Sequence, residues 1–230
     1  MASPSTVPLA PAPPAPAHAA AVFGPALPVI ERYAALLAGA GVERGLIGPH
    51  ETPRLWERHL LNCAGVASLL EPGQVVADVG SGAGLPGIVL AAMRPDVTVV
   101  LVEPLLRRAT FLEEVVAELE LRTAVVRRAR AEELAGKLQV DVVVARAVAP
   151  LDRLAGWALP LLGPGGRLLA LKGERADGEL ASSGAALKAA FAESAEVVVV
   201  GEQAQDTAGR VVVVTRGAGG PPAKKKKARR

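Results

Sequence analysis

The residues best able to do chemistry lie in a glycine-rich stretch after the first β-like run. Residues 76–87 read Val-Ala-Asp-Val-Gly-Ser-Gly-Ala-Gly-Leu-Pro-Gly. Glycines at positions 80, 82 and 84 let the backbone turn sharply and approach a ligand closely, because no Cβ intervenes. A loop of this kind between a strand and a helix marks the crevice where open α/β sheets bind ligands.

The loop also contains G-x-G-x-x-G at Gly82, Gly84 and Gly87, which is the dinucleotide fingerprint. Asp78 argues against a nicotinamide cofactor, because a carboxylate before the loop repels a pyrophosphate but suits an ammonium group. No Gly-Lys-Ser/Thr follows, which excludes a phosphate-binding P-loop. An acidic residue followed by alternating glycines is instead typical of S-adenosylmethionine (AdoMet) binding in Rossmann-like methyltransferases. The cofactor residues expected here are Asp78, Gly80, Ser81 and Gly82.

Two later segments complete the expected cofactor site. Glu103 ends the second β-like run, 23 residues after Gly80, and its carboxylate is placed to accept hydrogen bonds from ribose hydroxyls. A solvated strand end is the alternative for Glu103. Ala131 and Glu132 follow the third run, where the adenine edge is expected. For Glu132, an acidic residue stabilised by a helix dipole is an equal alternative.

After the fourth run the chain reads Val-Ala-Arg-Ala-Val-Ala-Pro, where many methyltransferases carry catalytic groups. The Asn/Asp-Pro-Pro-Tyr motif of exocyclic-amine methylases is missing. Pyrimidine C5 methylases need a nucleophilic cysteine, but Cys63 lies in the helical N-terminal part and suits a buried apolar role. What remains is Arg146. We assign it to positioning of cofactor or substrate, with a surface ion pair as the alternative, and we expect no catalytic acid, base or metal.

The elements that position these residues alternate in type from Val75 onward. Short β-branched runs begin near residues 75, 98, 123, 140, 167, 197 and 211, with helical patterns between most of them. The runs are nearly all apolar, as expected of parallel strands buried on both faces, and the last two are expected to pair antiparallel. The predicted fold is α/β: a Rossmann-like class I methyltransferase with a mostly parallel seven-stranded sheet, helices on both faces and an N-terminal helical extension.

Composition limits the class of protein, its cellular location and its division into segments. The chain has 230 residues, half of them hydrophobic, with one cysteine and three scattered histidines, which excludes a disulfide framework or a zinc site. No apolar stretch is expected to reach the roughly 20 residues that span a bilayer. We expect a cytoplasmic monomer without membrane contact. The expected segments are a disordered Pro/Ala-rich leader (1–28), the helical extension (29–72), the methyltransferase domain (73–216) and a disordered basic tail (217–230).

The formal net charge of +3 belongs to that tail. Residues 224–230 carry six positive charges, and the rest of the chain has a net charge of −3. A basic tail of this kind is drawn to polyanions such as RNA, although a solvated end is an equal alternative.

Several motifs together resemble the glucose-inhibited division protein B family, the small-subunit rRNA methyltransferases G. They cover about residues 24–216. The motifs are Arg-His-Leu-Leu-Asn-Cys (58–63), the glycine loop ending in Gly-Leu-Pro-Gly (78–87), Arg-Arg-Ala-Thr-Phe-Leu (107–112), Arg-Ala-Glu-Glu (130–133), Ala-Arg-Ala (145–147) and Ala-Leu-Lys-Gly (170–173). The resemblance implies AdoMet-dependent N7-methylation of a guanine in small-subunit (16S) rRNA. It also implies cofactor contacts at Gly80, Leu85, Ala131, Glu132 and Arg146. The leader and the tail lie outside the common pattern.

Guanine N7 chemistry agrees with the missing catalytic base, because N7 already has an in-plane lone pair. The protein then mainly aligns the reacting atoms and excludes water. The RNA partner, free or in a small ribosomal particle, needs cationic contacts, with Lys172 the favoured one. The candidates are Arg54, Arg58, His59, Arg107, Arg108, Arg127, Arg128, Arg130 and Lys172. For paired basic residues at helix ends, solvated side chains or partners of the helix dipole are the alternative. For His59 a satisfied, partly buried histidine is the favoured alternative. Other acceptors, small molecule or protein, and a non-catalytic RNA-binding protein stay open as alternative functions.

Overall fold

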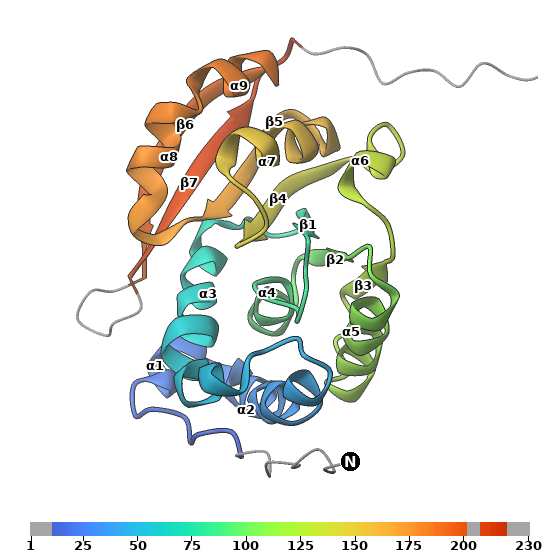
Figure 1. The fold of residues 1–230 in the computed structure, drawn as a ribbon, viewed down its shortest axis with the longest axis vertical. Coiled ribbons are helices and arrows are strands. Elements are labelled where there is room, and N and C mark those ends of the chain that lie inside the picture. The colour runs from blue at the N-terminus through green and yellow to red at the C-terminus, as the bar shows by residue number, and fades with distance from the viewer. Residues whose placement is uncertain (1–10, 202–207, 220–230) are drawn as a thin grey trace, which may run out of the picture.

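The protein is built around one seven-stranded sheet that separates two layers of helices (Figure 1). The computed structural model describes residues 11–201 and 208–219. The strand order is β3-β2-β1-β4-β5-β7-β6. The strands are β1 (Val75–Val79), β2 (Thr98–Val102), β3 (Ala124–Arg127), β4 (Val140–Arg146), β5 (Leu162–Leu171), β6 (Ala192–Val200) and β7 (Gly209–Arg216).

Strands β1 to β5 are parallel, whereas β7 runs antiparallel to both β5 and β6. This confirms the predicted fold class and the antiparallel pairing of the last two runs. Because β1 has β2 on one side and β4 on the other, the chain reverses its direction of winding between β1 and β4. A crevice at the carboxyl ends of the strands is expected at this switch point.

Each face of the sheet has its own hydrophobic core. The N-terminal helices, α4 (Gly87–Met93) and α5 (Leu106–Glu118) enclose one core. The other core lies beneath four later helices. These are α6 (Ala131–Leu134), α7 (Leu151–Ala158), α8 (Ala176–Ser182) and α9 (Gly184–Ala189). Burial on both faces explains why the parallel strands lack alternating polar residues.

The N-terminal helices form two runs that pack on the first core. The first run holds α1 (Ala19–Phe23), α2 (Leu27–Leu36) and the π-helix η2 (Leu37–Gly41). The second run holds the 3-10 helix η3 (Pro49–Arg54), the π-helix η4 (Leu55–Leu61), α3 (Asn62–Ala64) and the 3-10 helix η5 (Gly65–Leu69).

The predicted disordered leader is wrong for residues 11–28, which pack on the protein; residues 1–10 lie outside the described residues. The prolines do not prevent helix formation because Pro25 and Pro28 occupy first-turn positions, where a missing N–H costs nothing. The indole Nε1 of Trp56 donates to the carbonyl oxygen of Pro13 at 2.8 Å, and the ring of Phe23 meets the Trp56 ring edge-on. Of the predicted basic tail, only residues 217–219 are described.

The first helical run also corrects the expectation about apolar length. Residues Ala19–Gly41 form a helical stretch of 23 residues with mean hydropathy 1.3, enough by length and composition alone to cross a membrane. Its buried side chains include Phe23, Ile30, Tyr33 and Leu37, which all belong to the first core. Packing on a protein core therefore accounts for part of its apolar character, since 33% of its most apolar 18-residue window is buried.

Candidate functional site

The glycine loop lies at the carboxyl end of β1, where it turns into α4. The amides of Gly80 and Ser81 both donate to the carbonyl oxygen of Val102 at the end of β2, at 2.9 and 3.1 Å. Gly80, Gly82 and Gly84 adopt positive φ angles, which side chains with a Cβ rarely adopt. The Ser81 hydroxyl donates to the Asp78 carbonyl oxygen at 2.8 Å, so it braces the loop from within.

Asp78 is a buried carboxyl group with one oxygen free of protein partners. Its Oδ2 accepts the Gly87 amide at 3.0 Å, whereas Oδ1 is buried without a hydrogen-bond partner among the described residues. Burial raises the pKa of Asp78 from 3.8 to about 7, partly offset by the Gly87 hydrogen bond and by the Ser81 and Arg146 side chains. A buried, unpartnered carboxylate oxygen requires a donor or a cation. The ammonium group of an amino-acid moiety satisfies that requirement.

Glu103 is buried directly after β2 and organises the backbone around it. Its Oε2 accepts the Gly82 amide and its Oε1 accepts the Leu105 amide, each at 3.0 Å. The guanidinium of Arg108 lies 3.9 Å from Oε2. Glu103 is therefore not a solvated strand end. Since each carboxylate oxygen has a second lone pair, the group can still accept from a ribose diol.

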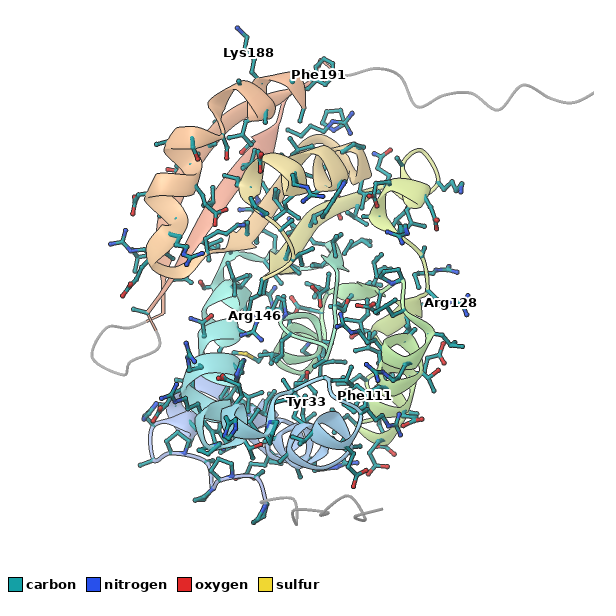
Figure 2. The ribbon with its side chains drawn as sticks, viewed as in Figure 1. Tyr33, Phe111, Arg128, Arg146, Lys188 and Phe191 are labelled. Carbon is teal, nitrogen blue, oxygen red and sulfur yellow. The ribbon has the colours of Figure 1, made fainter. Side chains whose placement is uncertain are left out.

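Arg146 is the last residue of β4, on the other side of the switch point from β2. Its guanidinium donates to His59 Nδ1 from Nη1 and Nη2, each at 3.1 Å, and from Nη1 to the Arg58 carbonyl oxygen at 3.2 Å. Figure 2 shows Arg146 beside the second helical run, and the residue is partly exposed. Ala147 follows with a φ of 55°, an uncommon conformation for a non-glycine residue that often marks functional sites.

Tyr33 is a site residue that sequence reasoning missed. Although it lies 50 positions before the loop, its hydroxyl donates to the carbonyl oxygen of Ala83 at 2.7 Å, and its side chain is fully buried. Burial raises the pKa of Tyr33 well above its ordinary value, so the hydroxyl remains a donor. No local sequence pattern predicts this long-range contact, because it forms only when α2 packs against the loop.

The remaining expected cofactor residues lie around the loop but differ in exposure. Leu85 is buried in the first core, and Ala131 is buried against the second core at the start of α6. Glu132 is exposed in the first turn of α6. Their contacts with AdoMet stay predictions.

The RNA candidates fall into two groups. Arg54, Arg107, Arg127, Arg128 and Arg130 are exposed, and Arg58 is exposed but contacts Glu51. Arg108 is only partly exposed and lies beside the buried Glu103. Figure 2 shows Arg128 pointing outward on the side of β3 and α5. His59 has 14% of its side chain exposed and bonds to Glu51 and Arg146, as a satisfied histidine does.

Lys172 requires a correction. Its ammonium lies 2.8 Å from a carboxylate oxygen of Glu179 and donates to the Ala149 carbonyl oxygen at 2.6 Å, with only 9% of the side chain exposed. Glu179 in turn accepts the Leu151 amide at the start of α7. Lys172 therefore ties the segment after β4 to α8, and its charge is already compensated, so it does not suit the predicted RNA contact.

Comparisons with known proteins identify the family. A family model described as rRNA small subunit methyltransferase G (GidB) matches residues 26–208. The chain belongs to this family. It is 58% identical over 191 residues to the ribosomal RNA small subunit methyltransferase G of Thermobifida fusca, covering 83% of this chain and 81% of that protein. The protein of the same name from Mycolicibacterium gilvum is 55% identical over 204 residues, which cover 87% of this chain and 89% of that protein.

Membership of the methyltransferase G family confirms the resemblance and the prediction of an AdoMet-dependent methyltransferase. Solved structures support the fold alone. A SAM-dependent methyltransferase from Aquifex aeolicus aligns with a TM-score of 0.54 at 20% identity, covering 72% of this chain and 94% of that one. A SAM-dependent O-methyltransferase from Thermotoga maritima aligns with a TM-score of 0.52 at 16% identity. The alignment covers 70% of this chain and 66% of that one.

Proposed function

We propose that this protein transfers a methyl group from AdoMet to N7 of a specific guanine in small-subunit (16S) rRNA. The observation that carries the proposal is the match to the methyltransferase G family over residues 26–208. The relatives with 55 to 58% identity carry the name ribosomal RNA small subunit methyltransferase G. We further propose that it acts as a cytoplasmic monomer without membrane contact and accepts its RNA free or in a small ribosomal particle.

The side chains of the site suit a reaction that needs alignment rather than proton transfer. AdoMet supplies an electrophilic methyl carbon on a sulfonium, whose leaving group is neutral. Asp78 would hold the ammonium of the cofactor with Oδ1, and Glu103 would accept from its ribose. Guanine N7 has a lone pair in the ring plane, so no residue has to remove a proton before attack. The chain's contribution is then to fix geometry and exclude water.

The cofactor contacts of Gly80, Ser81, Gly82, Leu85, Ala131, Glu132 and Arg146 belong to the same proposal. Arg146 is a permanent cation at the carboxyl end of β4, beside the switch point. The methylated guanine is cationic, so this arginine does not stabilise the product ring. We assign it to positioning of the cofactor.

Transfer of labelled methyl groups tests the proposal. Small ribosomal subunits that lack the modification and naked rRNA would be incubated with the protein and labelled AdoMet, followed by nucleoside analysis. We expect N7-methylguanosine at a single rRNA position, and the better of the two substrates identifies the required state of the RNA. AdoMet binding without transfer to either substrate would discard the rRNA acceptor and favour a small-molecule or protein acceptor, or RNA binding without catalysis.

A further inference from the structure

Arg146, His59 and Glu51 form a continuous chain of hydrogen bonds beside the glycine loop. Both terminal guanidinium nitrogens of Arg146 reach His59 Nδ1, and His59 Nε2 lies 2.9 Å from Glu51 Oε2. The other Glu51 oxygen accepts from the Arg58 side chain at 3.3 Å. Because a guanidinium only donates, Nδ1 must offer its lone pair. The ring proton then lies on Nε2, which donates to Glu51.

We propose that His59 and Glu51 are positioning residues that hold Arg146 in place for AdoMet binding and methyl transfer. The proposal rests on the proposed function for its reaction and goes beyond it by assigning roles to two residues of the N-terminal helical region. Glu51 fixes which ring nitrogen of His59 carries the proton. His59 then presents an acceptor to Arg146.

The side chain that accepts from Arg146 is a neutral imidazole and not a carboxylate. A carboxylate would orient Arg146 but would also compensate its charge. Among the described residues, Arg146 has no ion pair with an acidic side chain, and its side-chain hydrogen bonds go to the neutral ring of His59 and a carbonyl oxygen. The guanidinium is therefore held in one orientation while its positive charge stays available to an anionic group. The cofactor's carboxylate is such a group.

The backbone around both residues favours a fixed geometry. His59 belongs to the π-helix η4, a rare helix type that often occurs at functional sites. Arg146 directly precedes Ala147, whose φ of 55° holds the chain in a strained conformation. Neither feature is needed for a surface ion pair.

The charges around His59 also favour the neutral ring. Arg146 faces it from β4, Glu51 and Arg58 face it from its own helical run, and Arg54 lies near Glu51. The charge of Arg146 also acts on the buried Tyr33, Cys63 and Asp78, and it lowers the pKa of each of them against the larger effect of burial. Burial and then Arg146 lower the pKa of His59, against the raising effect of Glu51. Protonation of Nδ1 in acid would remove the acceptor and add a second cation beside Arg146.

Two substitutions of His59 separate the two hydrogen bonds. The asparagine of His59→Asn has an acceptor at the position of Nδ1, so it can still face Arg146. The longer glutamine of His59→Gln has its amide at the position of Nε2, so it can face Glu51 but leaves Arg146 without the acceptor. We expect His59→Gln to raise the AdoMet dissociation constant, and to lower kcat/KM for transfer, by about tenfold or more. His59→Asn should retain several times more of both. The exposed His50→Gln is the matched control and should behave as the wild type.

A double-mutant cycle then decides whether His59 acts through Arg146. Arg146→Ala should weaken AdoMet binding, and His59→Gln should add little in that background, because its effect has already been lost. Equal effects of His59→Gln with and without Arg146 would overturn the proposal. So would equal losses in His59→Asn and His59→Gln, which indicate a structural role alone; thermal unfolding of each variant shows whether it is folded. The pH profile is a further readout: the acid-side loss of AdoMet affinity should be smaller in His59→Asn than in the wild type.

These measurements keep the two proposals apart. If the wild type binds AdoMet but methylates no rRNA substrate, the proposed function fails. The cofactor-binding cycle still supports or overturns the positioning role of His59, because it needs no RNA.

Discussion

The hydroxyl of Tyr33 donates a hydrogen bond to the carbonyl oxygen of Ala83, so α2 holds the glycine loop from outside the sheet domain. The loop is thus fixed from two directions. The amides of Gly80 and Ser81 bind it to the end of β2, and Tyr33 binds it to the N-terminal helices. The helical region is therefore part of the candidate cofactor site as well as a cover for the first core.

Tyr33→Phe removes this hydroxyl without changing the packing of the ring. We expect the free energy of unfolding to fall by about 1–3 kcal/mol, because the buried Ala83 carbonyl loses its side-chain donor. AdoMet affinity should also fall, since the loop is less well fixed. Urea unfolding and calorimetric titration with AdoMet measure the two effects.

Trp56→Phe is the matched control for Tyr33→Phe. It also removes one side-chain donor from a buried aromatic residue, in this case the donor to the Pro13 carbonyl oxygen. It should lower stability while AdoMet affinity stays unchanged. If both variants weaken AdoMet binding equally, the Tyr33 hydroxyl has no specific role in the loop.

Gly87→Ala tests the close approach of α4 to Asp78. A Cβ at this position would lie 2.3 Å from Leu101 Cδ2 and 2.6 Å from Asp78 Oδ2, both too close. We expect a loss of about 1–3 kcal/mol in stability from overpacking and weaker AdoMet binding, because Asp78 must move. Gly156→Ala in α7 is the control: no atom lies within 4 Å of its Cβ, so it should stabilise by up to about 1 kcal/mol. Equal stability of the two variants would contradict the packing argument.

Local sequence patterns were enough to predict most of the sheet domain. Apolar β-branched runs identified each of the strands in the described chain. For the inner strands the reason is that doubly buried strands have few polar residues to obscure them, whereas the edge strands β3 and β6 keep exposed positions. The glycine loop located the candidate cofactor site for a similar reason: positive φ angles leave little choice of residue type at Gly80, Gly82 and Gly84.

What sequence reasoning missed depends on tertiary contacts. The Pro-rich segment 11–28 lacks any periodic pattern, yet Trp56 and Phe23 anchor it. The sequence predicted Lys172 as an RNA contact at the carboxyl end of a strand. Its partner Glu179 lies in α8, which only the folded structure brings close. Tyr33 contacts Ala83 and His59 contacts Arg146 across 50 and 87 positions of the chain, and no spacing rule relates such pairs.

Asp78 couples the stability of the ligand-free protein to pH. Its pKa is about 7 in the folded protein, against an ordinary 3.8, because burial disfavours the charged form. Between these values the folded state keeps a proton that the unfolded state has released, so the free energy of unfolding falls as the pH rises. Asp78→Asn removes this dependence. We expect the variant to have a higher Tm than the wild type at about pH 8, with a smaller difference at about pH 4.

The same substitution should weaken AdoMet binding, because an amide cannot pair with an ammonium group as a carboxylate does. Glu113→Gln on the exposed side of α5 is the control and should change neither property. Scanning calorimetry over the pH range and titration with AdoMet measure both. A Tm difference between Asp78→Asn and wild type that does not change with pH would show that Asp78 does not titrate in this range.

The exposed arginines at and directly after the end of β3 should bind RNA through phosphate charge alone. Arg127, Arg128 and Arg130 have no ion pair with an acidic side chain in the described part of the chain. Arg128→Ala should therefore weaken binding to small-subunit rRNA and reduce the slope of log affinity against log salt by about 0.7–0.9. Stability should change by less than about 0.5 kcal/mol, because the side chain is exposed.

Lys172→Ala should have the opposite profile. Removal of its ammonium leaves Glu179 without its cation and the Ala149 carbonyl oxygen without its donor, so stability should fall by about 1–3 kcal/mol. The salt slope should stay at the wild-type value, since the charge of Lys172 is already compensated within the protein. Fluorescence anisotropy with labelled rRNA at several salt concentrations, together with urea unfolding, compares the two variants. A reduced salt slope in Lys172→Ala, with stability unchanged, would restore Lys172 as an RNA contact.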